Sequence, residues 1–202
     1  MDFQKLVTER HAVKKFDGKR ISTEEIKQII STASLAPSGI NIQSWHFVIV
    51  ESNKARAALI PEINPSNKKQ IQTAGAVLLL FADPDYAGLS RLIAERAGDS
   101  LSEIDKERYI KRYVAYVDSF SPEYLNTYMS WTSGLITMNL LYAIYNAGYK
   151  ANVVRGFKTQ KINEILNIDA RFRPEFIIPI GSSDETGEAS FRLSLDDIAE
   201  VR

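Results

Sequence analysis

The sequence predicts a mixed fold of β-strands and α-helices with a strongly helical middle. Short apolar runs predict buried strands at residues 46–50 and 76–82. The stretch between Glu123 and Lys150 contains no charged residue and predicts one long buried helix. The chain has 202 residues, of which 45% are hydrophobic, so we expect a single domain over residues 1–202.

Charge and composition narrow the possible functions. The formal net charge is +0, which provides no overall field to attract nucleic acid or an anionic membrane. The chain has no cysteine and only two histidines, so we expect no disulfide, no thiol nucleophile and no metal site. The N-terminal stretch MDFQKLVTERHAVKKF carries charges throughout and has no apolar run. We therefore expect a cytoplasmic protein rather than a secreted one.

The N-terminal part is predicted to contain two helices. Residues 2–9 are expected to form a short helix capped by Asp2. Ser22 and Glu25 have the spacing of a capping box, in which each side chain binds the backbone amide of the other residue. A second helix should begin there and end before Pro37, because proline disfavours the helical conformation of the residue that precedes it.

The strand at 46–50 follows a loop of small polar residues. Trp45 and His46 begin this strand, and we expect both to pack in the core, with the imidazole hydrogen-bonded. Ser52 can cap the next short helix. The proline-containing segment 61–67 is predicted to be a loop.

The helical middle is predicted from its caps. Asp83, followed by proline, should begin one helix, and residues 102–120 should form another. Ser121 caps the uncharged helix, which Gly148 ends. At about 1.5 Å per residue this helix would be roughly 40 Å long, which suggests the core of a dimer. Its many polar residues would be costly against lipid, so we do not expect it to cross a membrane.

The C-terminal part is predicted to contain two more strands. They are expected at residues 150–154 and 175–180, and Thr159 should cap a helix between them. The tail FRLSLDDIAEVR is predicted to be irregular.

Two sets of side chains could bind a ligand. If residues 10–14 are extended, Arg10, Ala12 and Lys14 lie on one side and form an anion seat, but these residues alone are more typical of a solvated basic segment. In the helical middle, aromatic residues recur at Tyr109, Tyr113, Tyr116 and Phe120. Such spacing is more typical of packing than of a binding wall.

Several separated motifs together resemble one known family. They are RHAVKKF, APSGINIQSWHFVIV, the segment from Asn67 to Gln70 ahead of AVLLLFA, and RPEFIIPIG with the tail FRLSLDDIAEVR. In this order, and over essentially the whole chain, they resemble the FMN-dependent nitroreductase family. The resemblance implies an α+β fold, a three-layer α/β/α sandwich with a mixed, largely antiparallel sheet. It also implies an intertwined homodimer with FMN sites at the interface.

The resemblance assigns the phosphate end of FMN to three basic residues. Arg10 and Lys14 match the family's N-terminal element, with Ala12 where a serine usually stands, and Arg192 matches a basic residue near the C-terminus. Cations around a phosphate make strong, charge-assisted contacts. The resemblance thus favours the anion seat over the solvated segment.

The resemblance also assigns the flavin ring. A loop is implied to lie against it from the partner subunit, through Pro37, Ser38, Asn41 and Gln43, with Ser44 in place of a second proline. Asn67 matches a residue at the pyrimidine edge, and Gln70 stands where relatives often carry lysine. A neutral amide stabilises the charge of reduced flavin less than an ammonium does, so we predict a lower reduction potential.

Residues near position 155 complete the implied cofactor contacts. Arg155 replaces a common acidic residue before Gly156, but the family's contact to flavin N5 is a backbone N–H that arginine can also supply. Val153 belongs to the same segment. No side chain is nominated as a catalytic acid or base.

The resemblance implies an oxidoreductase with ping-pong kinetics. Reducing equivalents pass from NADH or NADPH through flavin N5 to a nitroaromatic, a quinone or a similar small molecule, next to the aromatic residues of the middle helix. Two alternatives remain. One is a flavin-binding or scaffold protein with little turnover, and the other is a relative that performs dehalogenation, flavin breakdown or dihydropteridine reduction.

Overall fold

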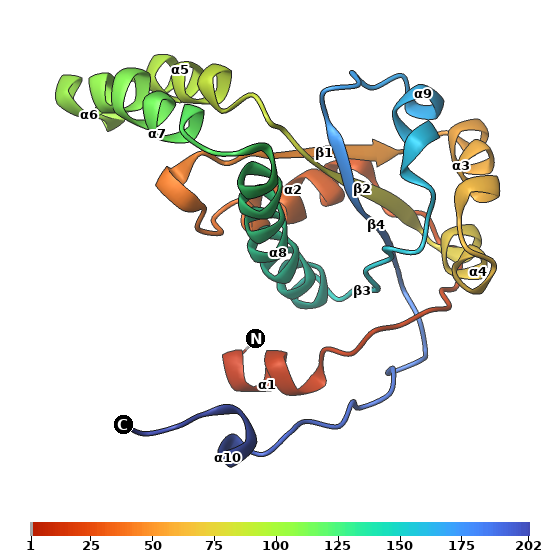
Figure 1. Cartoon of the computed structure of the whole chain (residues 1–202). Coiled ribbons are helices and arrows are strands. Elements are labelled where there is room, and N and C mark those ends of the chain that lie inside the picture. The colour runs from red at the N-terminus through yellow and green to blue at the C-terminus, as the bar shows by residue number, and fades with distance from the viewer. Residues whose placement is uncertain (1) are drawn as a thin grey trace.

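A four-stranded antiparallel sheet lies at the centre of the computed structural model, which describes residues 2–202 (Figure 1). The strand order is β1-β2-β4-β3, and the strands are β1 (Trp45–Val50), β2 (Ala76–Ala82), β3 (Lys150–Ala151) and β4 (Arg173–Gly181). Each pairing of named strands is antiparallel. A parallel bridge from Ala12 to Ala151 adds the N-terminal segment, so the sheet is mixed and largely antiparallel, as expected.

Helices cover both faces of this sheet (Figure 1). Strand β2 is buried along its whole length, as a strand covered on both faces must be. Leu78 and Leu80 belong to an apolar cluster with α2 and α8, whereas Val77 and Leu79 belong to a second cluster with α3 and α9. The helices are α1 (Phe3–Glu9), α2 (Thr23–Ala33), α3 (Asn53–Leu59), α4 (Pro65–Thr73), α5 (Tyr86–Arg96), α6 (Glu103–Glu107), α7 (Val114–Asp118), α8 (Pro122–Asn146), α9 (Ile162–Leu166) and α10 (Leu195–Ile198).

The long helix α8 has one exposed apolar face. Ser121 caps it as expected, and Gly148, with a φ of 88°, follows its end. Trp131, Leu135 and Met138, at helical spacing, are 55%, 47% and 37% exposed in the single chain. One chain therefore leaves this face uncovered, and the burial expected on most faces stays a prediction that depends on a partner chain. Among residues 2–202, no helix is long and apolar enough to span a membrane.

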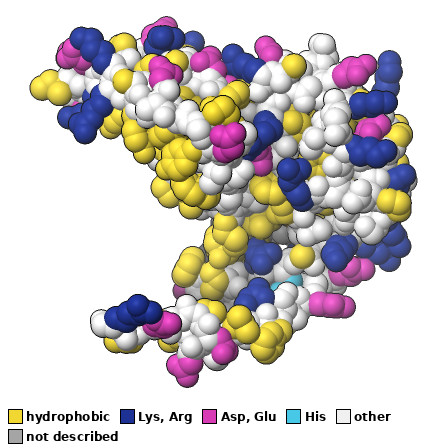
Figure 2. All heavy atoms as spheres, viewed as in Figure 1, with side chains coloured by type: hydrophobic (Ala, Val, Ile, Leu, Met, Phe, Trp, Pro, Cys, Tyr) yellow, Lys and Arg dark blue, Asp and Glu magenta, His cyan; other side chains and the backbone are white. Residues whose placement is uncertain are grey.

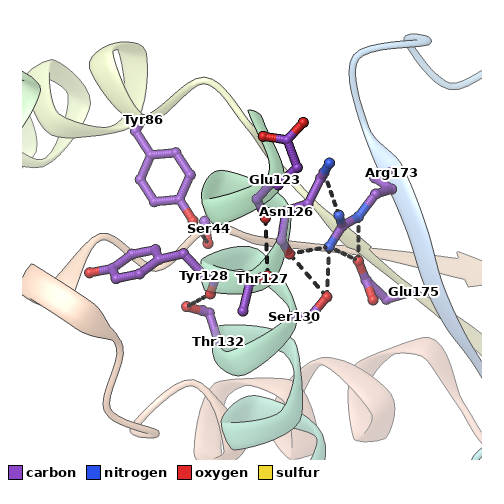
Figure 3. Close-up of polar contacts among 10 residues, drawn as sticks. All are labelled: Ser44, Tyr86, Glu123, Asn126, Thr127, Tyr128, Ser130, Thr132, Arg173 and Glu175. Carbon is purple, nitrogen blue, oxygen red and sulfur yellow. Dashed lines mark hydrogen bonds and ion pairs between the residues drawn. The ribbon is translucent and has the colours of Figure 1, made fainter. Parts of the chain in front are cut away.

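A polar network fastens α8 to β4. Arg173 donates through Nε to Glu175, at 2.6 Å, and through Nη1 to the Asn126 side chain, at 2.7 Å. Its Nη2 donates to Ser130 on the next turn of α8 (Figure 3). The Glu175 side chain is only 6% exposed, so Arg173 supplies the charge that its carboxylate needs.

The N-terminal expectations hold in part. The capping box of Ser22 and Glu25 is present at the start of α2. Asp2 precedes α1, but its side chain makes no capping hydrogen bond, and α1 buries none of its residues. Trp45 packs against the core. The imidazole of His46 is half-buried and stacks on Phe172 at 4.3 Å, and it finds no hydrogen-bond partner within residues 2–202, so the expected hydrogen bond stays a prediction.

Several predicted boundaries are wrong. Helix α4 begins at Pro65, inside the predicted loop 61–67, because proline suits the first helical position. Helix α5 is capped by Asp85 rather than Asp83. Of the predicted 102–120, residues 103–118 are helical, and the π-helical turn η4 (Arg108–Tyr113) interrupts them.

The C-terminal boundaries also differ from the prediction. Strand β3 covers two residues of the predicted 150–154, and beyond it only Val154 forms an isolated bridge. Thr159 begins a short 3₁₀ turn, η5 (Thr159–Lys161), without a side-chain cap, and α9 follows. Strand β4 starts two residues earlier than predicted. The tail contains α10, with a capping box of Ser194 and Asp197.

Candidate functional site

The loop between α2 and β1 contains a cluster of strained residues. Ile40, Asn41 and Gln43 have φ values of 50°, 53° and 52°. Positive φ is unusual for any residue other than glycine, and especially for a β-branched residue such as isoleucine. Such strain persists only where the surroundings enforce it, and it is concentrated at functional sites.

Contacts with the helical middle hold this loop in place. Within the loop the Gln43 backbone N–H donates to the Ser38 hydroxyl at 3.0 Å, and Asn41 Nδ2 donates to the Tyr109 hydroxyl at 3.2 Å. The Tyr128 ring on α8 packs so closely on Gly39 that a Cβ there would collide with its hydroxyl. The loop is thus shaped by residues about 70 to 90 positions further along the chain.

Ser44 has a structural reason to replace the proline of the resembled motif. It is 1% exposed, and its hydroxyl lies 3.3 Å from the hydroxyl of buried Tyr86 (Figure 3). Burial raises the pKa of Tyr86 to about 12, so this phenol stays protonated. A proline at position 44 could not hydrogen-bond to it.

A second group of predicted site residues surrounds the N-terminal segment. The Val13 amide donates to the Ala151 carbonyl at 3.2 Å, which holds the segment extended beside β3. Arg10 is half-buried, and its Nε is buried without a hydrogen-bond partner within residues 2–202. Lys14 is exposed on the same segment. The basic pair is therefore available to an anion.

Three amide side chains form a chain of hydrogen bonds next to this segment. Asn152 donates to Gln70 Oε1 at 2.8 Å, and Gln70 Nε2 donates to Asn67 Oδ1 at 2.9 Å. Gln70 is 1% exposed, so its amide is oriented by its two neighbours. The Asn67 amide points towards Gly156, where a Cβ would lie 2.6 Å from Asn67 Nδ2.

The segment around Arg155 completes this group. The Gly156 carbonyl accepts from the backbone N–H of Asn64 at 2.9 Å, which fixes the segment against the start of α4. The backbone N–H of Arg155 donates no hydrogen bond within the described residues, and its guanidinium lies 5.7 Å from the Phe157 ring. Val153 is half-buried beside them.

The predicted site residues thus form two separate groups. The loop with exposed Pro37 and Asn41 and half-buried Ser38 and Gln43 lies on the side of the lobe formed by α5, α6 and α7, whereas α4, which carries Asn67 and Gln70, lies at the other end of the sheet (Figure 1). The C-terminal tail passes the second group at Gly187, next to Ala12. Arg192 is exposed further along the tail, where it donates to the Phe191 carbonyl. One chain does not bring the two groups together.

Two of the four predicted aromatic residues line a cavity, and the other two pack against them. Tyr113 and Tyr116 line a cavity of about 430 Å³. Tyr109 lies behind Tyr113 with ring centroids 4.9 Å apart, and Phe120 contacts the Tyr116 ring at 4.8 Å.

Some residues of both groups have no signal in the sequence. Arg108, Arg112 and Tyr128 also line the cavity, and Asn152 orients Gln70, but none of them belongs to a recognisable motif. Their roles depend on which distant segments meet in the folded chain.

Comparisons with known proteins agree with this geometry. A family model described as the nitroreductase family matches residues 7–182. The candidate NAD(P)H nitroreductase Spy0809 of Streptococcus pyogenes is 36% identical over 202 residues, with 100% of both chains covered. The crystal structure of a nitroreductase family protein from Streptococcus pneumoniae is 36% identical and covers 100% of both chains, with a TM-score of 0.94.

A third relative was crystallised with a cofactor. The structure of this Exiguobacterium sibiricum protein contains FMN and is 28% identical to the chain, with a TM-score of 0.94 over 100% of this chain and 98% of the other. The two structural comparisons confirm the α+β fold that the sequence motifs imply.

Proposed function

Since the chain belongs to the nitroreductase family, we propose that it is an FMN-dependent oxidoreductase that uses NADH or NADPH. The proposed acceptor is a nitroaromatic, a quinone or a similar small molecule, reduced in a ping-pong cycle. One observation supports this proposal most strongly. Within residues 2–202, a basic segment with a buried nitrogen that has no hydrogen-bond partner lies beside an oriented amide chain and a backbone N–H that donates no hydrogen bond.

The residues of the second group fit FMN. Arg10, whose buried Nε has no partner among the described residues, would hold the phosphate with Lys14, and Arg192 of the tail would join them. A guanidinium binds phosphate through paired, charge-assisted hydrogen bonds. Ala12 supplies no hydroxyl, so the seat depends on charge and backbone amides.

The flavin ring would lie beyond this seat. Asn67 would contact its pyrimidine edge, and the Arg155 N–H, free within residues 2–202, would donate to N5. A side chain at position 156 would collide with Asn67, so Gly156 leaves room for this arrangement. When bound, FMN would supply the redox chemistry, accepting hydride and returning electrons to an acceptor.

We further propose a homodimer in which the loop of one chain covers the flavin of its partner. Figure 2 shows hydrophobic side chains along the hollow between the helical lobe and the terminal arms. The exposed face of α8 and exposed apolar residues of the arms, including Phe3, Phe191 and Leu195, support a second copy as the partner. Large exposed apolar surfaces of this kind mark interaction sites.

Light scattering after size-exclusion chromatography tests the dimer. Leu135→Asp on α8 should convert a dimer to a monomer, because burial of a charge at an apolar interface is costly. Leu92→Asp is the matched control, since Leu92 is 46% exposed on α5 and Leu135 is 47% exposed. A wild-type monomer, or dissociation by both variants alike, would contradict the proposed interface.

The test of function starts with the colour of the purified protein. A yellow protein that NADH or NADPH bleaches without oxygen, and that a nitroaromatic or quinone restores, agrees with the proposal. Parallel lines in double-reciprocal plots would identify the ping-pong cycle. A colourless protein that FMN does not reconstitute would refute the proposed function. A yellow protein that neither NADH nor NADPH reduces would indicate a flavin-binding protein.

Two broader statements stay proposals. Residues 1–202 would form one domain, because all three apolar clusters include residues of β2. A cytoplasmic location remains a prediction of the sequence.

A further inference from the structure

The cavity beside the strained loop combines aromatic walls with positive charge. It has a volume of about 430 Å³ and lies between the loop, the helical segment 108–116 and α8. Its lining is Ile40, Arg108, Arg112, Tyr113, Tyr116 and Tyr128. Two guanidinium groups and no carboxylate line it, so an anion there would meet attraction and no acidic neighbour in the lining.

One of these cations is uncompensated. The π-helical turn η4 carries three basic residues, and two of them have acidic partners. Arg108 pairs with Asp105 and Lys111 pairs with Glu107. Arg112 makes no ion pair or hydrogen bond within the described chain. Its charge is therefore available to a ligand.

The helix geometry directs the arginines to the cavity. A π-helical turn contains one more residue than an α-helical turn, and such turns are frequent at functional sites. Arg108 and Arg112 both line the cavity from this turn, whereas Lys111 lines a different surface hollow. The planar fork of arginine matches a carboxylate better than the point charge of lysine does.

We propose that this cavity seats the electron acceptor and that Arg112, with Arg108 beside it, selects acceptors carrying a carboxylate on an aromatic body. The proposal rests on the proposed function, because the loop that forms one wall is the loop expected to cover the flavin. The volume lies at the small end of ligand pockets, which suits a single-ring compound. We therefore assign the anion to the acceptor rather than to the phosphates of a nicotinamide dinucleotide.

Two acceptors that differ by one charge test this selection. Para-nitrobenzoate and para-nitrobenzamide share the ring and the nitro group. The FMN-loaded wild type should prefer the carboxylate by about tenfold in kcat/KM, since a charge-assisted contact is strong but solvent screens an exposed guanidinium. Arg112→Gln should remove the preference, and Arg112→Lys should restore part of it.

A matched control separates the site from general charge. Lys111→Gln removes the same charge one residue away, outside the cavity, and should keep the preference. If the wild type does not discriminate, or if Arg112→Gln discriminates as the wild type does, the proposal is overturned. It is also overturned if Arg112→Gln slows flavin reduction by NADH or NADPH and leaves acceptor preference unchanged.

A binding measurement decides the inference without turnover. Calorimetric titration of the oxidised, purified protein with benzoate, which cannot be reduced through a nitro group, should give a Kd about tenfold weaker for Arg112→Gln. Equal affinities in wild type and variant would overturn the anion site. If no nicotinamide reduces the protein while benzoate still binds through Arg112, the proposed function fails and the anion site stands.

Discussion

The amide chain of Asn152, Gln70 and Asn67 can be tested by one nearly isosteric substitution. Gln70→Leu keeps the volume of the side chain but removes the acceptor at 2.8 Å from Asn152 and the donor at 2.9 Å from Asn67. Each buried polar group left without a partner costs about 1–3 kcal/mol. Asn67 and Asn152 are only half-buried, so the lower part of this range applies.

The net effect follows from opposing terms. Loss of two hydrogen bonds at about 1.5 kcal/mol each is partly offset by the burial of a more apolar side chain. We expect Gln70→Leu to lower the free energy of unfolding by about 2 kcal/mol. For a domain of this size, that corresponds to a decrease in Tm of about 4–8 °C.

Urea denaturation measures this difference directly. Wild type and variant are compared at one protein concentration without added FMN, because ligand binding and association both change apparent stability. Gln72→Leu is the control, since Gln72 is exposed on the same helix and its replacement should stay within about 0.5 kcal/mol. Equal stabilities of the two variants would refute the role given to the amide chain.

Three further substitutions test other contacts. Gly39→Ala should weaken FMN binding several-fold in a fluorescence titration, because the added Cβ would collide with the Tyr128 hydroxyl. Adding Tyr128→Phe to the same chain removes that hydroxyl and should restore part of the affinity. If it restores none, the collision is not the cause. Burial lowers the pKa of His46 in the folded chain, so as the pH falls the unfolded chain takes up the proton before the folded chain does. The free energy of unfolding should therefore decrease as the pH drops below about 6.5. His46→Phe should reduce this fall between about pH 7.5 and pH 5.5 in urea denaturation, and an unchanged slope would count against it. Arg173→Met should cost about 3 kcal/mol because it strands the buried Glu175 carboxylate, and the double variant with Glu175→Leu should recover most of that loss; a double variant as unstable as the single one would refute the pairing.

Local pattern was sufficient for much of the fold. The capping box of Ser22 and Glu25, the apolar run of β2 and the cap of α8 at Ser121 appear where the sequence predicts them. Each depends on neighbours within a few residues or on the period of apolar side chains. The predicted start of a helix was wrong where two residues could cap it, as at Asp83 and Asp85. Asp83 is buried and Asp85 caps α5, and burial of this kind is set by the tertiary structure.

For the candidate site, the sequence predicted which residues belong to it but not how they are arranged. Motifs along the chain indicate Arg10, Asn67, Gln70 and the loop near Ser38 without stating how they are held. The strained φ values of the loop require Tyr109 and Tyr128, which lie far away in sequence. No short-range pattern encodes a contact between segments so distant.

By itself, the sequence determined the family and the order of the elements, because these depend on local motifs and periodicity, and its resemblance to the family proposed which residues would hold a flavin. Only the tertiary structure decided that Asn152 orients Gln70 across 82 positions of the chain. It also decided that one chain keeps the two groups of site residues apart, and that η4 turns Arg112 towards an aromatic cavity. These features arise from packing between distant segments, which sets the direction of a side chain where the sequence states only its chemistry.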